Sequence, residues 1–269
     1  MGILYDRLLI LLNENSQDST FYHIALVMLQ NMASLKFLAI NEVAELCCVS
    51  KSTISKFIRA LGYEDYSEFR VAAEFKDNKY HNSYNYIEDV MGYLKHHTVE
   101  EYAHQMAADI EETAATLDWT MIDRLVDDLI AYKKVIALGM MFSGTAAMDL
   151  QIKLGYCGKF IAANIDDIKQ TQNVMRADRE TLLIVFSDSG QYLNRYETIE
   201  DFYHKDVFNT TKAKIVLITS DEQMAKDPRV SYSILFPRGK GVRTHRTTYP
   251  LLSDMIAWRY REKTHKELE

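Results

Sequence analysis

The sequence predicts a protein of the α plus α/β class: an all-helical N-terminal domain, then an α/β domain with a central, mostly parallel five-stranded sheet. Two observations predict this class. Over residues 4–75 the apolar side chains recur at the three- and four-residue spacing of amphipathic helices. From Lys133 onward, short apolar runs alternate with segments of helical length. Such alternation favours a parallel sheet covered on both faces, with any ligand at the carboxyl ends of the strands.

The length supports two modest domains, since 269 residues with 48% hydrophobic content can bury a substantial core. We expect a first domain at residues 1–78, a linker and connecting helix at 79–118, and a second domain at 119–269. The polar, unpatterned residues 77–85 mark the linker. The apolar spacing over residues 86–117 predicts one long helix.

Composition excludes several other classes of protein. The longest apolar runs are far shorter than the roughly 20 residues that cross a bilayer, and the N-terminus lacks the pattern of a signal peptide. We therefore expect a cytoplasmic protein without a membrane partner. Cys47 and Cys48 are adjacent, and no Cys or His cluster has metal-ligand spacing, so we expect buried thiols, no metal and no cofactor.

The helical half begins with an apolar stripe at Leu8, Leu9 and Leu12, followed by the polar residues 13–19, which supply a cap for a helix starting near Thr20. Residues 40–70 then have the pattern of a helix-turn-helix. Val43, Ala44 and Leu46 form the apolar face of its first helix, and Val49 fills the corner. Ser50 is a good N-cap for the second helix, and Gly62 ends it. The buried stripe of the second helix is expected at Ile54, Phe57, Ile58 and Leu61.

The outward face of the second helix is basic and rich in hydroxyl groups. It consists of Lys51, Ser52, Thr53, Ser55, Lys56 and Arg59. Hydroxyls near a helix start can meet base edges in the major groove, and cations can reach phosphates. Although acids outnumber bases by 38 to 31 in the chain, none lies between Glu45 and Glu64. This face therefore predicts DNA as a partner, against the alternative of a solvated surface helix.

Five strands are expected in the second half, at residues 135–138, 160–163, 181–186, 215–219 and 232–236. Two of them end in loops of the kind that hold phosphate. The first loop presents Ser143, Gly144 and Thr145 at the start of a helix, where backbone N–H groups and hydroxyls can bind an anion. The second presents Ser187, Ser189, Gly190 and Gln191. A third feature, the basic run 237–246, is either a solvated loop or a phosphate clamp.

Together these residues resemble the RpiR family of bacterial transcriptional regulators, in which a helix-turn-helix domain is joined to a SIS (sugar isomerase) domain. In the first half, the similarity rests on Val49, Ser50, Thr53, Ile54, Phe57, Leu61, Gly62 and Phe69. In the second half, Gly139, Ser143 and Gly144 are similar to a Gly-x-Gly-x-Ser-Gly loop. Ser187, Ser189 and Gly190 are similar to a Ser-x-Ser-Gly loop. The resemblance implies that both loops contact a phosphosugar.

The chain departs from the family pattern at three positions. Cys48 lies in the helix-turn-helix turn, where Gly is common, Met141 replaces the second Gly of the first loop, and Tyr192 stands where the second loop commonly has Thr or Ser. We expect a dimeric or tetrameric DNA-binding regulator without catalytic residues, whose SIS domain senses a phosphorylated sugar or related anion. One alternative is a phosphosugar isomerase, for which His204 and His245 are candidate bases by residue type alone. The other is a SIS domain that only dimerises.

Overall fold

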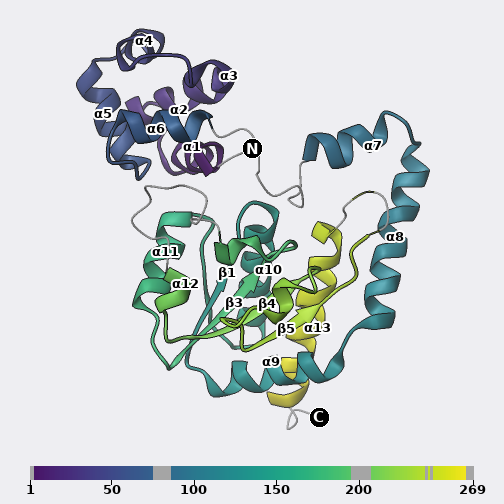
Figure 1. Cartoon of the computed structure of the whole chain (residues 1–269). Coiled ribbons are helices and arrows are strands. Elements are labelled where there is room, and N and C mark those ends of the chain that lie inside the picture. Colours follow the sequence, from purple (N-terminus) through teal and green to yellow (C-terminus); the bar gives the residue numbers. More distant parts are fainter. Residues whose placement is uncertain (1–2, 75–85, 195–206, 240–241, 243–244, 265–269) are drawn as a thin grey trace. The chain divides into compact units, whose positions relative to one another are not determined.

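A computed structural model of the chain describes residues 3–74, 86–194, 207–239, 242 and 245–264. The chain divides into two compact units, Met1–His81 and Asn82–Glu269 (Figure 1). The expected linker at residues 77–85 lies outside the described residues. The domain boundaries 1–78, 79–118 and 119–269 therefore stay a prediction.

The described part of the first unit is helical throughout. Its helices are α1 (Ile3–Glu14), α2 (Thr20–Gln30), α3 (Met32–Leu35), α4 (Ile40–Leu46), α5 (Lys51–Ala60) and α6 (Tyr66–Glu74). Leu8, Ile24 and Met28 are completely buried, as their spacing predicts. α2 begins at the expected cap, where the Ser19 hydroxyl accepts a hydrogen bond from the Tyr22 amide at 3.1 Å. These observations confirm the all-helical N-terminal domain.

Residues 86–117 do not form the single helix that their apolar spacing predicts. They form a short π-helix, η1 (Ile87–Met91), then α7 (Gly92–Leu94) and α8 (Val99–Thr116). The interruption follows from Thr98, whose hydroxyl accepts from the Glu101 amide while the Glu101 carboxylate accepts from the Thr98 amide. Such a capping box starts a new helix. Within the second unit, α8 packs along α13 (His245–Thr264).

The described part of the second unit contains the expected five strands in one sheet, all parallel, in the order β2-β1-β3-β4-β5. The strands are β1 (Lys134–Leu138), β2 (Ala162–Ala163), β3 (Thr181–Phe186), β4 (Lys214–Thr219) and β5 (Tyr232–Leu235). Registers such as Ile136 opposite Leu183 and Val216 opposite Tyr232 define the pairing. β2 is shorter than predicted, because it is an edge strand paired over two residues and Phe160, which precedes it, is 83% exposed.

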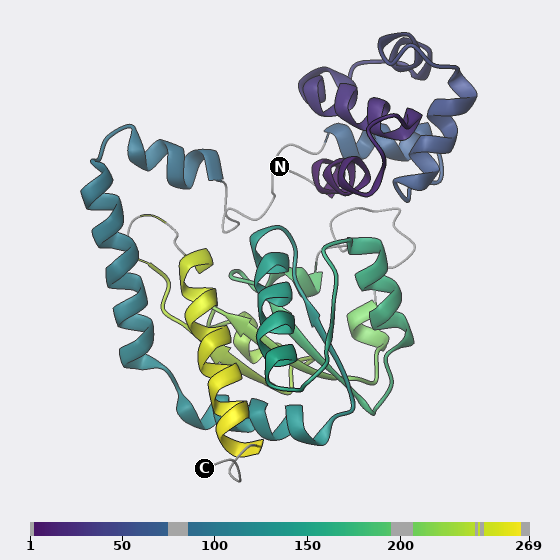
Figure 2. The same ribbon diagram turned by 180° about the vertical axis from the view of Figure 1, so that it is seen from behind.

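Helices cover both faces of this sheet, and alternate strand residues pack against each layer. α9 (Trp119–Ala131), α10 (Phe142–Tyr156) and α13 pack against Ala137, Ile184 and Val216 (Figure 2). On the opposite face, α11 (Asp167–Arg176) and α12 (Val207–Thr210) pack against Leu183 and Leu217. The chain thus leaves β1 toward one face and β3 toward the other. Between such strands, ligands of parallel sheets bind at the carboxyl ends.

No helix in the described ranges is both long enough and apolar enough to cross a membrane.

Candidate DNA-binding helix and ligand loops

The helix-turn-helix consists of α4 and α5, joined by residues 47–50. Val43 and Ala44 are buried as predicted, but Leu46 is 37% exposed, so its assignment to the apolar face was wrong. Cys47 occupies that buried position instead. The reason is geometric: Val43 and Ala44 flank the centre of the buried face, and at 3.6 residues per turn position 47 falls between them whereas position 46 falls to one side.

The turn after α4 has the left-handed conformation that Gly provides in related motifs, even though Cys48 occupies it. Cys48 has φ +53°. Its amide donates to the Glu45 carbonyl and the Val49 amide donates to the Ala44 carbonyl, which together form a Schellman motif. The departure at Cys48 therefore leaves the turn unchanged, at a backbone cost of roughly 1–2 kcal/mol. The Cys48 side chain is exposed, so the expectation of buried thiols holds for Cys47 and is wrong for Cys48.

α5 is capped by hydrogen bonds at both ends and packs through one buried face. The Ser50 hydroxyl accepts from the Thr53 amide at 3.1 Å, which confirms Ser50 as the N-cap. Gly62, with φ +83°, ends the helix. There the buried guanidinium of Arg7 donates to the Leu61 carbonyl at 2.9 Å, where a cation also complements the helix dipole. The four residues of the predicted stripe, Ile54, Phe57, Ile58 and Leu61, are all buried.

The opposite face of α5 carries exposed basic and hydroxyl side chains. Lys51, Ser52, Lys56 and Arg59 are exposed. Thr53 and Ser55 are half-buried, and the Ser55 hydroxyl donates to the Lys51 carbonyl at 3.1 Å. The face therefore presents three cations on a rigid helix, the arrangement that positions a recognition helix on phosphates.

The first ligand loop depends on a close approach of two backbone segments. A Cβ on Gly139 would lie 2.5 Å from the Ser143 carbonyl, and one on Gly144 would lie 3.0 Å from the Gly139 carbonyl oxygen. Met141 has φ +52° and ψ −122°, a backbone conformation that favours Gly, and the residue is 42% exposed. The loop therefore carries local backbone strain at Met141, of order 1–3 kcal/mol.

The predicted ligands of this loop lie at the start of α10, as expected. The amides of Ser143 and Thr145 donate to the carbonyls of Met140 and Met141, so neither amide is available to an anion. The Thr145 hydroxyl donates to the Phe142 carbonyl at 2.8 Å. The Ser143 hydroxyl lies 3.3 Å from the hydroxyl of Tyr249 on α13. Burial, followed by the nearby Asp188 charge, raises the pKa of Tyr249, so it acts as a neutral hydroxyl at this position.

The second loop follows β3 and curls into the 3-10 helix η2 (Gln191–Asn194). Ser187 is buried and its hydroxyl accepts from the Tyr192 amide at 3.3 Å. Ser189 and Gln191 are half-buried. Gly190 has φ +68°, and a Cβ there would lie 2.3 Å from the Cβ of Met224, so only Gly fits.

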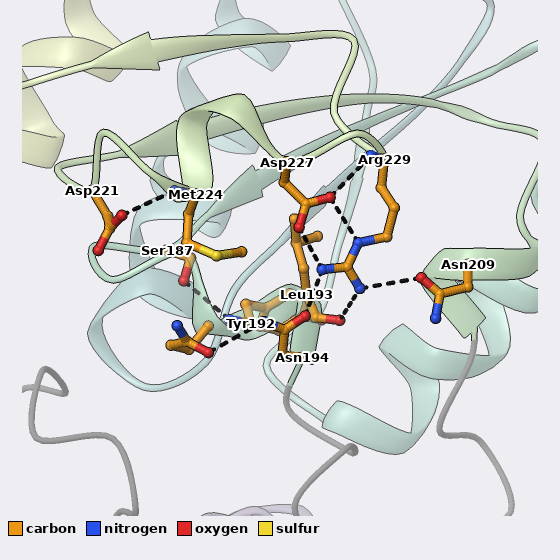
Figure 3. A network of polar contacts seen from close by, with 10 residues as sticks. Ser187, Tyr192, Leu193, Asn194, Asn209, Asp221, Met224, Asp227 and Arg229 are labelled. Carbon is orange, nitrogen blue, oxygen red and sulfur yellow. Dashed lines mark hydrogen bonds and ion pairs between the residues drawn. The ribbon is translucent and has the colours of Figure 1, made fainter.

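Arg229, in the connection between β4 and β5, is hydrogen-bonded to the end of this loop (Figure 3). Arg229 forms a bidentate ion pair with Asp227, at 2.8 and 2.6 Å. Its guanidinium also donates to the Leu193 carbonyl at 3.2 Å and to Asn194 at 2.5 Å. Hydrogen bonds from Arg229 hold the pKa of Asp227 below its usual value. One planar side chain therefore fixes the end of η2.

A buried amide brings the two loops together. The hydroxyl of Tyr192 donates to the side-chain oxygen of Gln170 on α11, and the Gln170 side chain also bonds the backbone of Gly139. Sequence reasoning did not find Gln170, Tyr249 or Arg229. The sequence carries no clear signal for Gln170, because the buried face of α11 is mostly polar and consists of Asp167, Gln170, Thr171 and Val174.

Of the remaining residues that the sequence singled out, some lie outside the described residues. In the basic run 237–246, Arg238 is exposed, while Lys240 and Arg243 lie outside the described residues. His204 also lies outside them, and His245 is the first residue of α13. Within the described ranges, no group of three His, Cys, Asp or Glu side chains is placed to hold a metal ion.

Comparison with known proteins assigns both units. Residues 12–79 match the model of the helix-turn-helix domain of the rpiR family. The chain is 23% identical over 195 residues to a helix-turn-helix-type transcriptional regulator of Providencia stuartii, over 71% of this chain and 67% of that protein. It is 25% identical over 170 residues to the transcriptional regulator HexR of Pseudomonas aeruginosa, over 62% of this chain and 59% of HexR.

The fold is shared with a solved structure of the Vibrio vulnificus NanR protein complexed with ManNAc-6P. That structure covers 98% of this chain and 93% of NanR, with a TM-score of 0.51 and 18% identity. At this identity the likeness concerns the fold alone. The chain therefore carries an N-terminal helix-turn-helix domain that matches the rpiR-family model, followed by an α/β domain whose fold it shares with NanR.

Proposed function

We propose that this chain is a DNA-binding transcriptional regulator whose second unit senses a phosphorylated sugar. The observation that carries the proposal is the exposed basic face of α5 within an rpiR-type helix-turn-helix domain. The whole chain is acidic, with a net charge of −7, so this local face must supply the attraction to DNA.

The test of this part is DNA binding by Lys56→Ala and Arg59→Ala, with an operator obtained by selection from random duplexes. Each lost phosphate contact should weaken binding and lower the slope of log K against log salt by about one. Lys133→Ala, which removes an exposed lysine of the second unit, is the matched control. Unchanged affinity and slope in both α5 variants would remove the assignment of α5 as the recognition helix.

We propose the two loops of the second unit as the effector site. Their hydroxyl residues Ser143, Thr145, Ser187 and Ser189 follow strands β1 and β3, which are neighbours in the sheet. Hydroxyls at a helix start and beside a glycine turn suit a phosphate group. Because NanR has been solved with ManNAc-6P, this compound belongs in the first panel of sugar phosphates, with inorganic phosphate for comparison.

Calorimetry tests the effector site. Saturable binding of one sugar phosphate should be weakened in Ser187→Ala and Ser189→Ala and kept in Ser231→Ala, an exposed serine before β5. If the full panel gives no saturable heat, the second unit serves dimerisation only. If Ser231→Ala weakens binding equally, the loss reflects general damage to the fold.

We further propose that the chain is a regulator rather than an isomerase. Isomerisation needs a general base beside the sugar. The only such assignments from the sequence were His204 and His245, which rest on residue type. Turnover of any sugar phosphate in the panel above background would revive the enzyme alternative.

We propose that the regulator acts as a homo-oligomer, because helix-turn-helix proteins bind two half-sites with two copies. One helix offers a face for a second copy: on α10, Met148, Ile152 and Tyr156 recur every four residues and are 37%, 58% and 86% exposed. An apolar stripe of this kind on a surface helix is typical of an interface.

A further inference from the structure

The side chain of Gln170 is completely buried beneath the candidate ligand loops and is fully hydrogen-bonded. Its oxygen accepts from the Gly139 amide at 3.2 Å and from the Tyr192 hydroxyl. Its nitrogen donates to the carbonyls of Gly139 at 2.7 Å and Asn164 at 2.6 Å. A primary amide has two donors and two acceptor positions, and here all four are used.

These partners come from three separate loops at the carboxyl ends of the strands. Gly139 directly follows β1, Asn164 directly follows β2, and Tyr192 lies in the turn after β3. Gly139 is bonded through both its N–H and its C=O, as it would be in a sheet ladder. The Gln170 amide thus continues the pairing of β1 beyond the point where the two-residue strand β2 ends.

Tyr192 connects this amide to the second loop. It is buried, its ring packs edge-on against Phe208 at 5.6 Å, and its amide donates to the Ser187 hydroxyl. The backbone amide of Tyr192 therefore contacts Ser187, a residue proposed to bind phosphate. Its side chain contacts the Gln170 amide. The proton of its hydroxyl is donated to Gln170 and is therefore not available to an anion.

We propose that Gln170 and Tyr192 are positioning residues that couple the loop after β1 to the loop after β3, so that the two loops order and loosen as one unit. A buried hydrogen-bonded network of this kind fixes a single arrangement when every member is satisfied. The presence of Tyr in place of the usual Thr or Ser then replaces a direct contact to the effector by a rigid link between its two binding loops. This last consequence rests on the proposed effector site, whereas the coupling itself does not.

The test uses hydrogen–deuterium exchange of the full chain without any effector. Tyr192→Phe keeps the ring and removes only the hydroxyl. We expect exchange to quicken by about fivefold or more in the peptide covering residues 139–144, which lies about fifty residues earlier in the chain. Tyr232→Phe is the matched control, because it also removes a buried hydroxyl donated to a buried acceptor, Asp128 at 2.6 Å, but at the amino-terminal end of β5.

Unchanged exchange at residues 139–144 in Tyr192→Phe would overturn the coupling. Equal acceleration in Tyr232→Phe would overturn it too, because the effect would then reflect lower global stability. A second arm measures ManNAc-6P binding by calorimetry, where coupling predicts weaker binding in Tyr192→Phe than in Tyr232→Phe. Absence of binding to the wild-type chain would count against this effector and leave the exchange result standing.

Discussion

At the scale of single residues, the chain adopts left-handed backbone conformations at two residues that do not favour them. Cys48 and Met141 both adopt positive φ at positions where Gly is usual. The sequence identifies these substitutions, but it cannot say whether the loop changes shape or the residue accepts strain. The structure answers this for both positions, because the local hydrogen bonds of the turn and the helix start persist.

Gly139 is the position in the ligand loops where the missing side chain matters most. Gly139→Ala should destabilise the second unit by about 1–3 kcal/mol, because the added Cβ would meet backbone atoms of Ser143 and Gly144 that cannot turn away. Gly155→Ala, within α10, meets nothing within 4 Å and should be neutral or stabilising by about 0.5–1 kcal/mol. Urea unfolding of both variants measures the difference. Equal stability would mean that the close approach in the first loop relaxes freely.

At the scale of elements, regular apolar patterns in the sequence predicted strands and helices correctly. Single local interactions and contacts between distant segments were missed. Periodicity located the strands and the buried stripe of α5. It failed for residues 86–117, where the single capping box at Thr98 outweighs a continuous apolar pattern. The candidate loops followed from strand ends, whereas Gln170 and Arg229 come from distant segments and meet them only in the folded chain.

The exposed stripe of α10 makes a prediction about assembly. Ile152→Asp should convert the proposed oligomer to monomer in sedimentation velocity, because a carboxylate would be desolvated at the centre of an apolar contact. Ile130→Asp on α9, where the side chain is 47% exposed, should leave the assembly unchanged. Dissociation by Ile130→Asp alone would place the interface on α9 and contradict the assignment to α10.

At the scale of the whole molecule, the ion pair between Arg229 and Asp227 should make the stability of the fold depend on pH in acid. Hydrogen bonds from Arg229 lower the pKa of Asp227 in the folded protein. The pair therefore stabilises the fold fully above the unfolded pKa of about 3.9, and this stabilisation is lost as pH falls through the lower folded value. The stability difference between wild type and Arg229→Met should thus narrow as pH falls from about 5 to 3. A difference independent of pH would show that Arg229 acts only by packing.

We propose that a ligand of the second unit alters DNA binding by the first. Linkage requires that an effector that favours one state of the protein change operator affinity, typically by about 5- to 150-fold. The direct measurement is operator binding by fluorescence anisotropy, with and without a sugar phosphate that calorimetry has shown to bind. We predict a shift of the binding curve that is lost in Ser187→Ala. Superimposable curves at saturating sugar phosphate would contradict the account.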